Sequence, residues 1–488
     1  MNYLELLRLA APEAAVVATA LVILAIGLAR DRRRGIASAV AAFGVALAIA
    51  ATFTLPPHAD LYAGMLVITP LTKLLKVICL ALAFFTVLLA RDEESALRNH
   101  AEYLAMILFA TVGLMLLVGS EELLMIFIGL ELTGLSLYIL AAFDRTNVRS
   151  AEAGLKYFLF GSTASAFTLF GLSFVYGTCG TTSLAAMSEK LAGQPTQPLL
   201  AAGIAMALAG FAFKVAAAPF HLWAPDVYQT APIPSAAFIA SGSKVASFSV
   251  LGKVLLLGLG PAHGSAAWHA MIAGWMPLVA ALAALSIVIG NLAALAQTNV
   301  RRLLAYSAVA HAGYTLLGLV AGGREGFSAT LFYTVTYAFT LVGVFGVVAL
   351  VRRETGGDDL THFAELRSRS PFLAGCMAIF ILSLAGLPPL AGFFGKFYLF
   401  SVALRSSPSS GLLWLIALAL VGSLVSLYYY LVILKVIFGG PGGAKPEQLS
   451  PITLGFLQLT TLTMLAGTVV FLGVLPGTLV AWIIASMS

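Results

Sequence analysis

Charged side chains inside long apolar stretches are the residues of this sequence best placed to do chemistry. Glu131 lies near the middle of such a stretch, and Lys214 and Lys396 lie too deep in theirs to reach the interface easily. A charged group at the centre of a bilayer costs roughly 2.5–3.5 kcal/mol on insertion scales. Groups kept there normally face a protein interior or a hydrated cavity and belong to an ion path. These three residues therefore indicate a path for an ion through the membrane.

Six further lysines within apolar stretches have two explanations, an interior position or a snorkelling one. They are Lys73, Lys76, Lys156, Lys244, Lys253 and Lys435. Lysines near a helix end can reach the interface with their long side chains, which we favour for Lys435. Lys253 follows Lys244 by nine residues, half a turn out of phase for a helix of about 3.6 residues per turn. The two cannot face the same path, and we favour Lys244, the deeper one; for the other three both explanations stay open.

Prolines interrupt the two stretches that carry Lys214 and Lys396. Pro219 and Pro225 follow the first lysine, and Pro388 and Pro389 precede the second. A proline breaks or kinks a helix, and in lipid such breaks are tolerated where they line a cavity. Ordinary kinks are common, but paired breaks in the two halves of a transporter point to its ion site. We therefore predict discontinuous seventh and twelfth helices.

The paired breaks also predict an internal repeat. The first repeat covers residues 102–258 (helices 4–8) and the second residues 266–438 (helices 9–13), within a single transmembrane domain spanning 1–488. Five helices are an odd number, so the two repeats are expected to be inverted in the membrane.

Two histidines extend the set of titratable candidates. His311 lies in the middle of an apolar stretch, and His221 lies at the end of the one that carries Lys214. A histidine can gain or lose a proton near neutral pH, which suits both to a proton relay. A hydrogen-bonded structural role for His311 and an interfacial anchor for His221 remain alternatives.

The elements that position these residues are membrane helices. Apolar residues make up 60% of the 488 residues and charged residues only 10%, whereas soluble proteins contain roughly 25% charged residues. A span needs roughly 20 apolar residues, which predicts an all-α membrane protein of about fourteen transmembrane helices. The expected spans are 13–29, 36–55, 66–90, 102–118, 122–143, 154–177, 199–221, 233–258, 275–297, 303–322, 327–351, 371–401, 411–438 and 453–484.

Basic residues in the connecting loops predict the orientation. The loops after helices 1, 3, 5, 9, 11 and 13 carry Arg30, Arg32, Arg33, Arg34, Arg91, Arg98, Arg145, Arg149, Arg301, Arg302, Arg352, Arg353, Arg367, Arg369 and Lys445. The opposite side carries only Arg8, Lys190, Arg324 and Arg405. Basic residues gather on the cytoplasmic side of membrane proteins, so both termini are expected to face away from the cytoplasm.

Other function classes lack their sequence signals. The formal charge of +6 is spread over short loops, unlike the basic patches of nucleic-acid binders. No GxxxxGK[ST] motif for ATP phosphates is present. The three cysteines, Cys79, Cys179 and Cys376, have no metal-site spacing. We expect no cofactor, no metal and no nucleic acid bound to this chain.

Three segments resemble the signatures of a known family. They are Pro219-Phe-His-Leu-Trp-Ala-Pro-Asp-Val-Tyr228 after Lys214, Arg302-Leu-Leu-Ala-Tyr-Ser307 through His311-Ala-Gly-Tyr314, and Gly386-Leu-Pro-Pro389 through Gly395-Lys-Phe397. Together they resemble the antiporter-like membrane subunits of bacterial proton-pumping NADH:quinone oxidoreductase, respiratory complex I. A lysine at 396 and the absence of a long C-terminal extension favour the N type, equivalent to mitochondrial NADH dehydrogenase subunit 2.

The resemblance implies a function and a set of site residues. It implies a translocase subunit in which Glu131, Lys214, Lys244 and Lys396 relay protons, with Lys156 as a secondary member. It also implies partners: the L-, M-, K-, J-, A- and H-type subunits, the peripheral arm and membrane lipid. NAD, FMN, iron–sulfur clusters and quinone would be bound by partner subunits, in a complex at the bacterial inner (plasma) membrane with both termini periplasmic. A subunit of a cation/proton antiporter is the alternative, because such proteins share these signatures.

The implied mechanism agrees with simple electrostatics. Taking a lysine out of water disfavours its charged form, and a nearby carboxylate favours that form again. A change in the distance between Glu131 and Lys214, or in their hydration, would switch the lysine between holding and releasing a proton. Repetition at Lys244 and Lys396 would pass protons along the chain.

Overall fold

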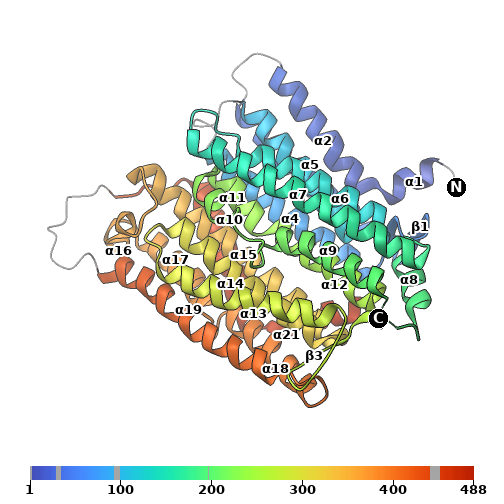
Figure 1. Cartoon of the computed structure of the whole chain (residues 1–488). Helices are drawn as coiled ribbons and strands as arrows, with labels where there is room; N and C mark the ends of the chain where they lie inside the picture. The colour runs from blue at the N-terminus through green and yellow to red at the C-terminus, as the bar shows by residue number, and fades with distance from the viewer. Residues whose placement is uncertain (1–2, 29–33, 93–98, 196, 440–450, 488) are drawn as a thin grey trace.

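The protein is an almost entirely helical bundle in a computed structural model that describes residues 3–28, 34–92, 99–195, 197–439 and 451–487 (Figure 1). The helices of the first half are α1 (Tyr3–Leu9), α2 (Ala11–Leu28), α3 (Arg34–Phe53), α4 (Pro70–Asp92), α5 (His100–Val118), α6 (Leu123–Ala141), α7 (Val148–Cys179), α8 (Leu184–Leu191), α9 (Pro198–Val215), α10 (Ala224–Thr230), α11 (Ile233–Ala240) and α12 (Gly242–Lys253). The helices of the second half are α13 (Trp275–Leu295), α14 (Val300–Ala321), α15 (Gly323–Thr355), α16 (Leu366–Arg369), α17 (Pro371–Ala385), α18 (Ala391–Ser410), α19 (Leu413–Gly439), α20 (Phe456–Val474) and α21 (Pro476–Ser486).

Short elements occupy the connections between the long helices. Two antiparallel hairpins are β1 (Ala59–Leu61) with β2 (Leu66–Ile68), and β3 (Ser265–Ala267) with β4 (Ala270–Ile272). One turn of π-helix, η1 (Val254–Gly258), continues α12, and the 3-10 turns are η2 (Gly260–Ala262) and η3 (Leu360–Phe363).

The predicted membrane helices are confirmed, apart from the continuity of the last one. Thirteen helices in the described ranges are long and apolar enough to span a membrane, and the remaining expected span, 371–401, is divided between α17 and α18. The prediction of one continuous last span, 453–484, was wrong. That stretch is α20 followed by α21, because Pro476 lacks the N–H that would continue α20 and starts a new helix instead.

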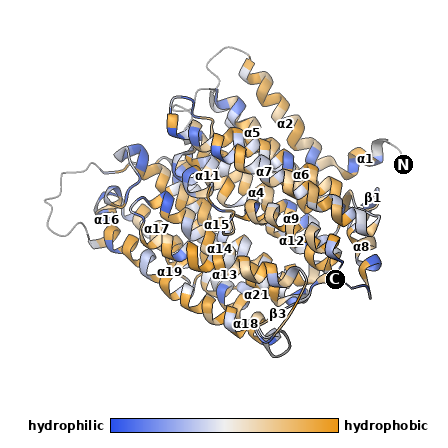
Figure 2. Cartoon of the chain, in the orientation of Figure 1, coloured by the Kyte–Doolittle hydropathy of each residue, from blue (hydrophilic) through white to orange (hydrophobic). Residues whose placement is uncertain are grey.

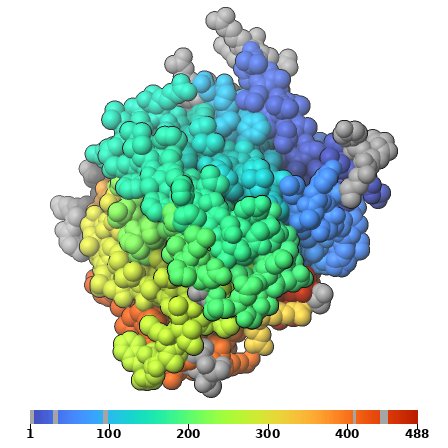
Figure 3. Space-filling view, turned by 45° about the vertical axis from the view of Figure 1, so that its right-hand side comes forward, coloured from blue at the N-terminus to red at the C-terminus, as the bar shows by residue number. Residues whose placement is uncertain are grey.

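The most central helices carry the middle of the candidate site. The segment from α11 to η1, together with α14 and α15, is almost completely buried, whereas most of α7 faces outward. In Figures 1 and 3 the blue-to-green first half and the yellow-to-red second half lie on two sides of the bundle. The central helices therefore lie where the two halves meet.

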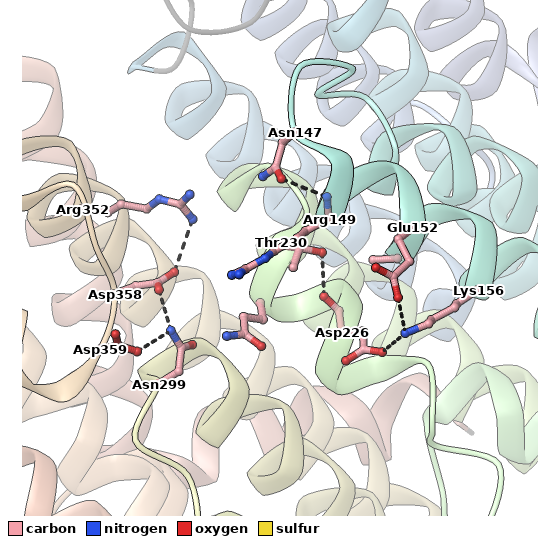
Figure 4. A pocket seen from close by; sticks show the side chains of 12 residues that line it. Asn147, Arg149, Glu152, Lys156, Asp226, Thr230, Asn299, Arg352, Asp358 and Asp359 are labelled. Atoms are coloured by element: carbon pink, nitrogen blue, oxygen red, sulfur yellow. Dashed lines mark hydrogen bonds and ion pairs between the residues drawn. The ribbon is translucent and has the colours of Figure 1, made fainter.

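The bundle has two polar ends and an apolar middle, as the hydropathy colours of Figure 2 show. Both termini, α1, β1 and α8 lie at one end, which we call the α1 end (Figure 1). Asn147, Arg352 and α16 lie at the other, the α16 end (Figures 1 and 4). Of the basic residues used to predict the orientation, Arg30, Arg32, Arg33, Arg98 and Lys445 lie outside the described residues.

Candidate functional site

Two interruptions of the helices next to Lys214 and Lys396 have the same backbone pattern. Ala216 after α9 and Gly386 after α17 both adopt positive φ, 57° and 83°. The next N–H in each case bonds back five residues, Ala217 to the Ala212 carbonyl at 2.8 Å and Leu387 to the Leu382 carbonyl at 3.0 Å. This is the helix-ending motif in which a left-handed residue satisfies the last carbonyls.

The likeness continues beyond these two ends. A cis peptide bond follows each left-handed residue at the same distance, Ala218–Pro219 in one and Pro388–Pro389 in the other. Asp226 lies ten residues after Ala216, and Lys396 lies ten residues after Gly386. The two halves of the chain therefore carry charged residues of opposite sign at matching positions.

Lys214 lies on the last turn of α9 and contacts α6. Its Nζ donates to the Leu130 carbonyl at 3.3 Å and to the Tyr138 hydroxyl at 3.4 Å, and it lies 5.5 Å from the centre of the Tyr138 ring. Glu131, the next residue on α6, is half-buried and accepts a 2.5 Å hydrogen bond from Ser165 of α7. The two charged groups are thus neighbours, with no ion pair within 4 Å between them.

Lys244 lies beside a third break, which the sequence analysis missed. Ser241 separates α11 from α12 with φ −116° and ψ −82°. The segment Ser241-Gly-Ser243 contains no proline, and its small residues were the only signal. From the first turn of α12, the Lys244 Nζ donates to the Ala308 carbonyl of α14 at 2.7 Å and lies 5.7 Å from the Tyr337 ring centre.

His311 stands between Lys244 and Lys396 within a cluster of tyrosines. Its ring stacks on Tyr337, with centres 4.7 Å apart, and meets the edge of Tyr314 at 5.6 Å. Its Nδ1 lies 2.6 Å from the Tyr333 hydroxyl and its Nε2 lies 3.0 Å from the Tyr430 hydroxyl. Both ring nitrogens of His311 are therefore engaged with groups that can pass a proton.

Lys396 completes this sequence of contacts on α18. Its Nζ lies 5.4 Å from the Tyr314 ring centre, so Lys244, Tyr337, His311, Tyr314 and Lys396 form a continuous chain. The same Nζ donates to the Ser423 hydroxyl at 3.1 Å, the Ser426 hydroxyl at 3.4 Å and the Ala385 carbonyl at 3.2 Å. Ala385 is the last residue of α17, and the carbonyl end of a helix favours a cation.

Lys156 is separate from these buried lysines and lies at the α16 end. It forms ion pairs with Glu152 at 2.8 Å and with Asp226 at 2.9 Å, and its side chain is 42% exposed. Arg302 also binds Asp226, at 2.8 Å. Although burial raises the pKa of Asp226, hydrogen bonds from Lys156 and Arg302 hold this pKa below its usual range.

A polar cavity of about 390 Å³ opens beside Lys156. Figure 4 shows Lys156 and Asp226 on one side of it, and Asn299 and Arg352 on the other around Asp358. Arg301, which is fully buried, also binds Asp358 at 3.3 Å. The cavity is lined by polar residues from both halves of the chain and lies at the α16 end.

His221 lies in the break between α9 and α10. Its side chain is buried, it meets the edge of Tyr306 at 6.3 Å, and its Nδ1 has no hydrogen-bond partner among the described residues. The burial of this side chain is unlike that of a residue anchored at the membrane surface.

Two further lysines, Lys76 and Lys253, are buried although the sequence analysis did not assign them to the interior path. Lys76, for which snorkelling stayed open, is fully buried and pairs with Glu13 at 2.7 Å. Lys253 is also buried, and it faces Val118 of α5 whereas Lys244 faces α14. The half-turn argument was right about their different directions, but depth alone did not reveal that both lie inside. Lys435 is exposed.

Known proteins resemble this chain over nearly its whole length. A family model described as NADH:quinone oxidoreductase/Mrp antiporter, TM, matches residues 120–426. The NADH-quinone oxidoreductase subunit N 2 of Acidobacterium capsulatum is 45% identical over 500 residues, 99% of either chain. The NADH-quinone oxidoreductase subunit N of Moorella thermoacetica is 42% identical over 451 residues, which are 91% of this chain and 92% of that protein.

Solved structures share the fold. A chain of respiratory complex I from Thermus thermophilus has a TM-score of 0.79 and 32% identity, covering 96% of this chain and 98% of that chain. A chain of the Mrp complex from Dietzia has a TM-score of 0.83 at 19% identity, covering 98% and 97% of the two chains. The second likeness is one of fold alone.

Proposed function

The chain belongs to the NADH:quinone oxidoreductase/Mrp antiporter family, and we propose that it relays protons in the membrane part of an NADH-quinone oxidoreductase. The relay consists of Glu131, Lys214, Lys244 and Lys396, which we call the charge line. Quinone reduction in partner subunits would drive it, and no redox step takes place in this chain.

The observation that carries this proposal is that three lysines are buried without a counter-ion. Lys214, Lys244 and Lys396 are 9%, 2% and 5% exposed, and none has a carboxylate within 4 Å among the described residues. Lys76, Lys156 and Lys253, by contrast, are all paired. Burial disfavours the charged form of an unpaired lysine, so small changes in its surroundings can release or restore its proton.

The remaining candidates have supporting roles in this proposal. His311 connects Lys244 with Lys396 through tyrosine rings, and a neutral imidazole can pass a proton between its two nitrogens. Lys156 is a secondary member, placed beside the polar cavity where protons would be collected. His221 lies beside the first break and would relay protons between the cavity and Lys214.

The inverted repeat of residues 102–258 and 266–438 stays part of the proposal. The matching backbone at Ala216 and Gly386 supports it, as does the equivalent placing of Asp226 and Lys396. Breaks at corresponding positions in two repeats are the usual arrangement around a transporter's ion site.

The partners and location follow from the same proposal. The structural match is a chain of a multi-subunit complex, and we infer neighbours of the L-, M-, K-, J-, A- and H-type and a peripheral arm that binds NAD, FMN and iron–sulfur clusters. We further infer a bacterial inner membrane with the α16 end in the cytoplasm and the α1 end outside. The excess of basic residues at the α16 end supports this orientation.

Cysteine labelling tests the orientation. In a background without the three native cysteines, Gln194→Cys at the α1 end should react with an impermeant thiol reagent in intact cells. Arg145→Cys, an equally exposed position at the α16 end, should react only in inverted vesicles. The opposite pattern would reverse the orientation.

A glycine next to Lys214 gives a test of the charge line that leaves every titratable group in place. A Cβ at Gly134 would lie 2.6 Å from the Lys214 Nζ, whereas nothing lies within 4 Å of a Cβ at Gly177. Gly134→Ala should therefore displace the ammonium group and lower NADH-driven proton uptake into inverted vesicles several-fold, measured per assembled complex. Gly177→Ala should leave it unchanged. Normal uptake in Gly134→Ala would argue against Lys214 as a relay residue.

The alternative function, a subunit of a cation/proton antiporter, is supported by the family model, whose description names the Mrp antiporter beside NADH:quinone oxidoreductase. Purified protein in liposomes would distinguish the two. Exchange of sodium or potassium for protons without NADH oxidation would support the antiporter, and its absence would support the oxidoreductase subunit.

A further inference from the structure

Two buried lysine–glutamate ion pairs lie outside the charge line, at the end of α5 nearest the termini. The Lys76 Nζ lies 2.7 Å from Glu13 Oε1, and the Lys253 Nζ lies 3.2 Å from Glu121 Oε1. The first pair joins α2 to α4, and the second joins α12 to the loop between α5 and α6. We call these four residues the α5 ion-pair cluster.

The two pairs meet at the C-terminus of α5. The Lys253 Nζ donates to the Val118 carbonyl at 3.0 Å, and a Cβ at Gly119 would lie 3.4 Å from the Lys76 Nζ. The last carbonyls of a helix carry partial negative charge. The Lys253 ammonium therefore binds this electronegative helix end, and the absence of a side chain at Gly119 leaves room for the Lys76 ammonium beside it.

Glu121 has the most exposed side chain of the α5 ion-pair cluster. The side chains of Lys76, Lys253 and Glu13 are 1%, 2% and 8% exposed, whereas that of Glu121 is 30% exposed. The buried Glu13 Oε2 accepts no hydrogen bond from any described residue. A static buried ion pair normally has its remaining lone pairs satisfied, so the free oxygen leaves a place for a proton, and Glu121 offers an opening to water.

The cluster lies one helix segment away from the charge line. Lys253 follows Lys244 by nine residues on α12, about 13 Å along the axis, and Glu121 precedes Glu131 by ten, about 15 Å. Both displacements point toward the α1 end (Figure 1). Ser249, one turn before Lys253, is buried, and its hydroxyl has no partner among the described residues.

We propose that the α5 ion-pair cluster is the station through which protons leave the charge line toward the α1 end. This rests on the relay proposed above. The Lys253 ammonium gives its proton to the Glu121 carboxylate, the carboxylic acid releases it to water, and Lys253 regains a proton from the interior. The neighbouring pair of Lys76 and Glu13 has no net charge, and each cycle moves one proton and leaves the charge of the cluster as it was.

The test compares Glu121→Gln with a neighbouring lysine variant in assembled complex. Glu121→Gln should lower NADH-driven proton uptake into inverted vesicles several-fold per assembled complex, and Glu121→Asp should retain most of it. Lys73→Met is the control, because Lys73 lies on α4 one turn from Lys76 and, among the described residues, its Nζ donates only to the Leu55 carbonyl. It should pump normally.

A static clamp predicts a different result. If the cluster only holds the helices together, Glu121→Gln and Lys253→Met should lower the amount of assembled complex. The charge-exchanged variant, Lys253→Glu with Glu121→Lys, should then restore this amount. Proton uptake per assembled complex should stay normal in all of these variants. That outcome would overturn the inference. Lys396→Met is measured alongside: loss of uptake there with normal uptake in Glu121→Gln rejects the release station only, whereas normal uptake in both also rejects the charge line.

Discussion

Lys396→Met is expected to abolish most NADH-driven proton pumping while the complex remains assembled. Methionine is similar in length and lacks the charge, and replacing a buried charged group by an apolar one of similar volume is often tolerated. The Ser423 hydroxyl and the Ala385 carbonyl would lose a donor, at about 1–3 kcal/mol for each group left unsatisfied. The contact chain through Tyr314 and His311 would end without a proton carrier.

Lys435→Met provides the matched control for this change. Lys435 is exposed on α19, and its loss removes the same chemical group from a surface position. Proton uptake into inverted vesicles, normalised to assembled complex, should be almost normal in Lys435→Met and nearly absent in Lys396→Met. Equal effects in the two variants would show that burial does not distinguish relay lysines from others.

Hydropathy was enough to predict the helices, but it did not predict where they are interrupted. Runs of apolar residues require helices in lipid, since backbone groups there must be bonded internally. Proline marked the interruptions at Pro219 and Pro388 in the sequence. The break at Ser241 has no proline to mark it in the sequence. Pro476 did signal a helix start, and a long apolar run concealed it.

Depth along a helix was only a partial guide to which lysines are buried. Lys214 and Lys396 were predicted to be buried because each lies deep in its apolar stretch and beside a proline break, and both are buried. Lys76 lies close to a helix end and is nevertheless buried, because Glu13 of a different helix neutralises it there. A partner more than 60 residues away is a property of tertiary packing. The contacts of His311 with tyrosines also depend on tertiary packing, and the sequence analysis did not predict them.

The structure also changes how Glu131 and Lys214 are expected to act on each other. A direct ion pair would hold the lysine charged at all times, whereas here Lys214 binds the carbonyl of Leu130 and the hydroxyl of Tyr138. Glu131 is held by Ser165 instead. Influence through space, without a direct bond, allows Glu131 to favour the charged form of Lys214 and still permits release of its proton.

Glu131→Gln is expected to remove most pumping-linked turnover, because glutamine has the same shape and no charge, and Lys214 would lose the nearby negative charge that favours its proton. Glu131→Asp keeps the charge and should retain a good part of the turnover. Lys214→Arg should be impaired, because arginine keeps its proton under all physiological conditions and Gly134 leaves little room around the ammonium.

Glu325→Gln, an exposed carboxylate in the first turn of α15, is the control and should be normal. The measurement is NADH-driven proton uptake into inverted vesicles per assembled complex. Full uptake in both Glu131→Gln and Lys214→Arg would mean that these residues stabilise α6 and α9 and that the relay does not pass through them.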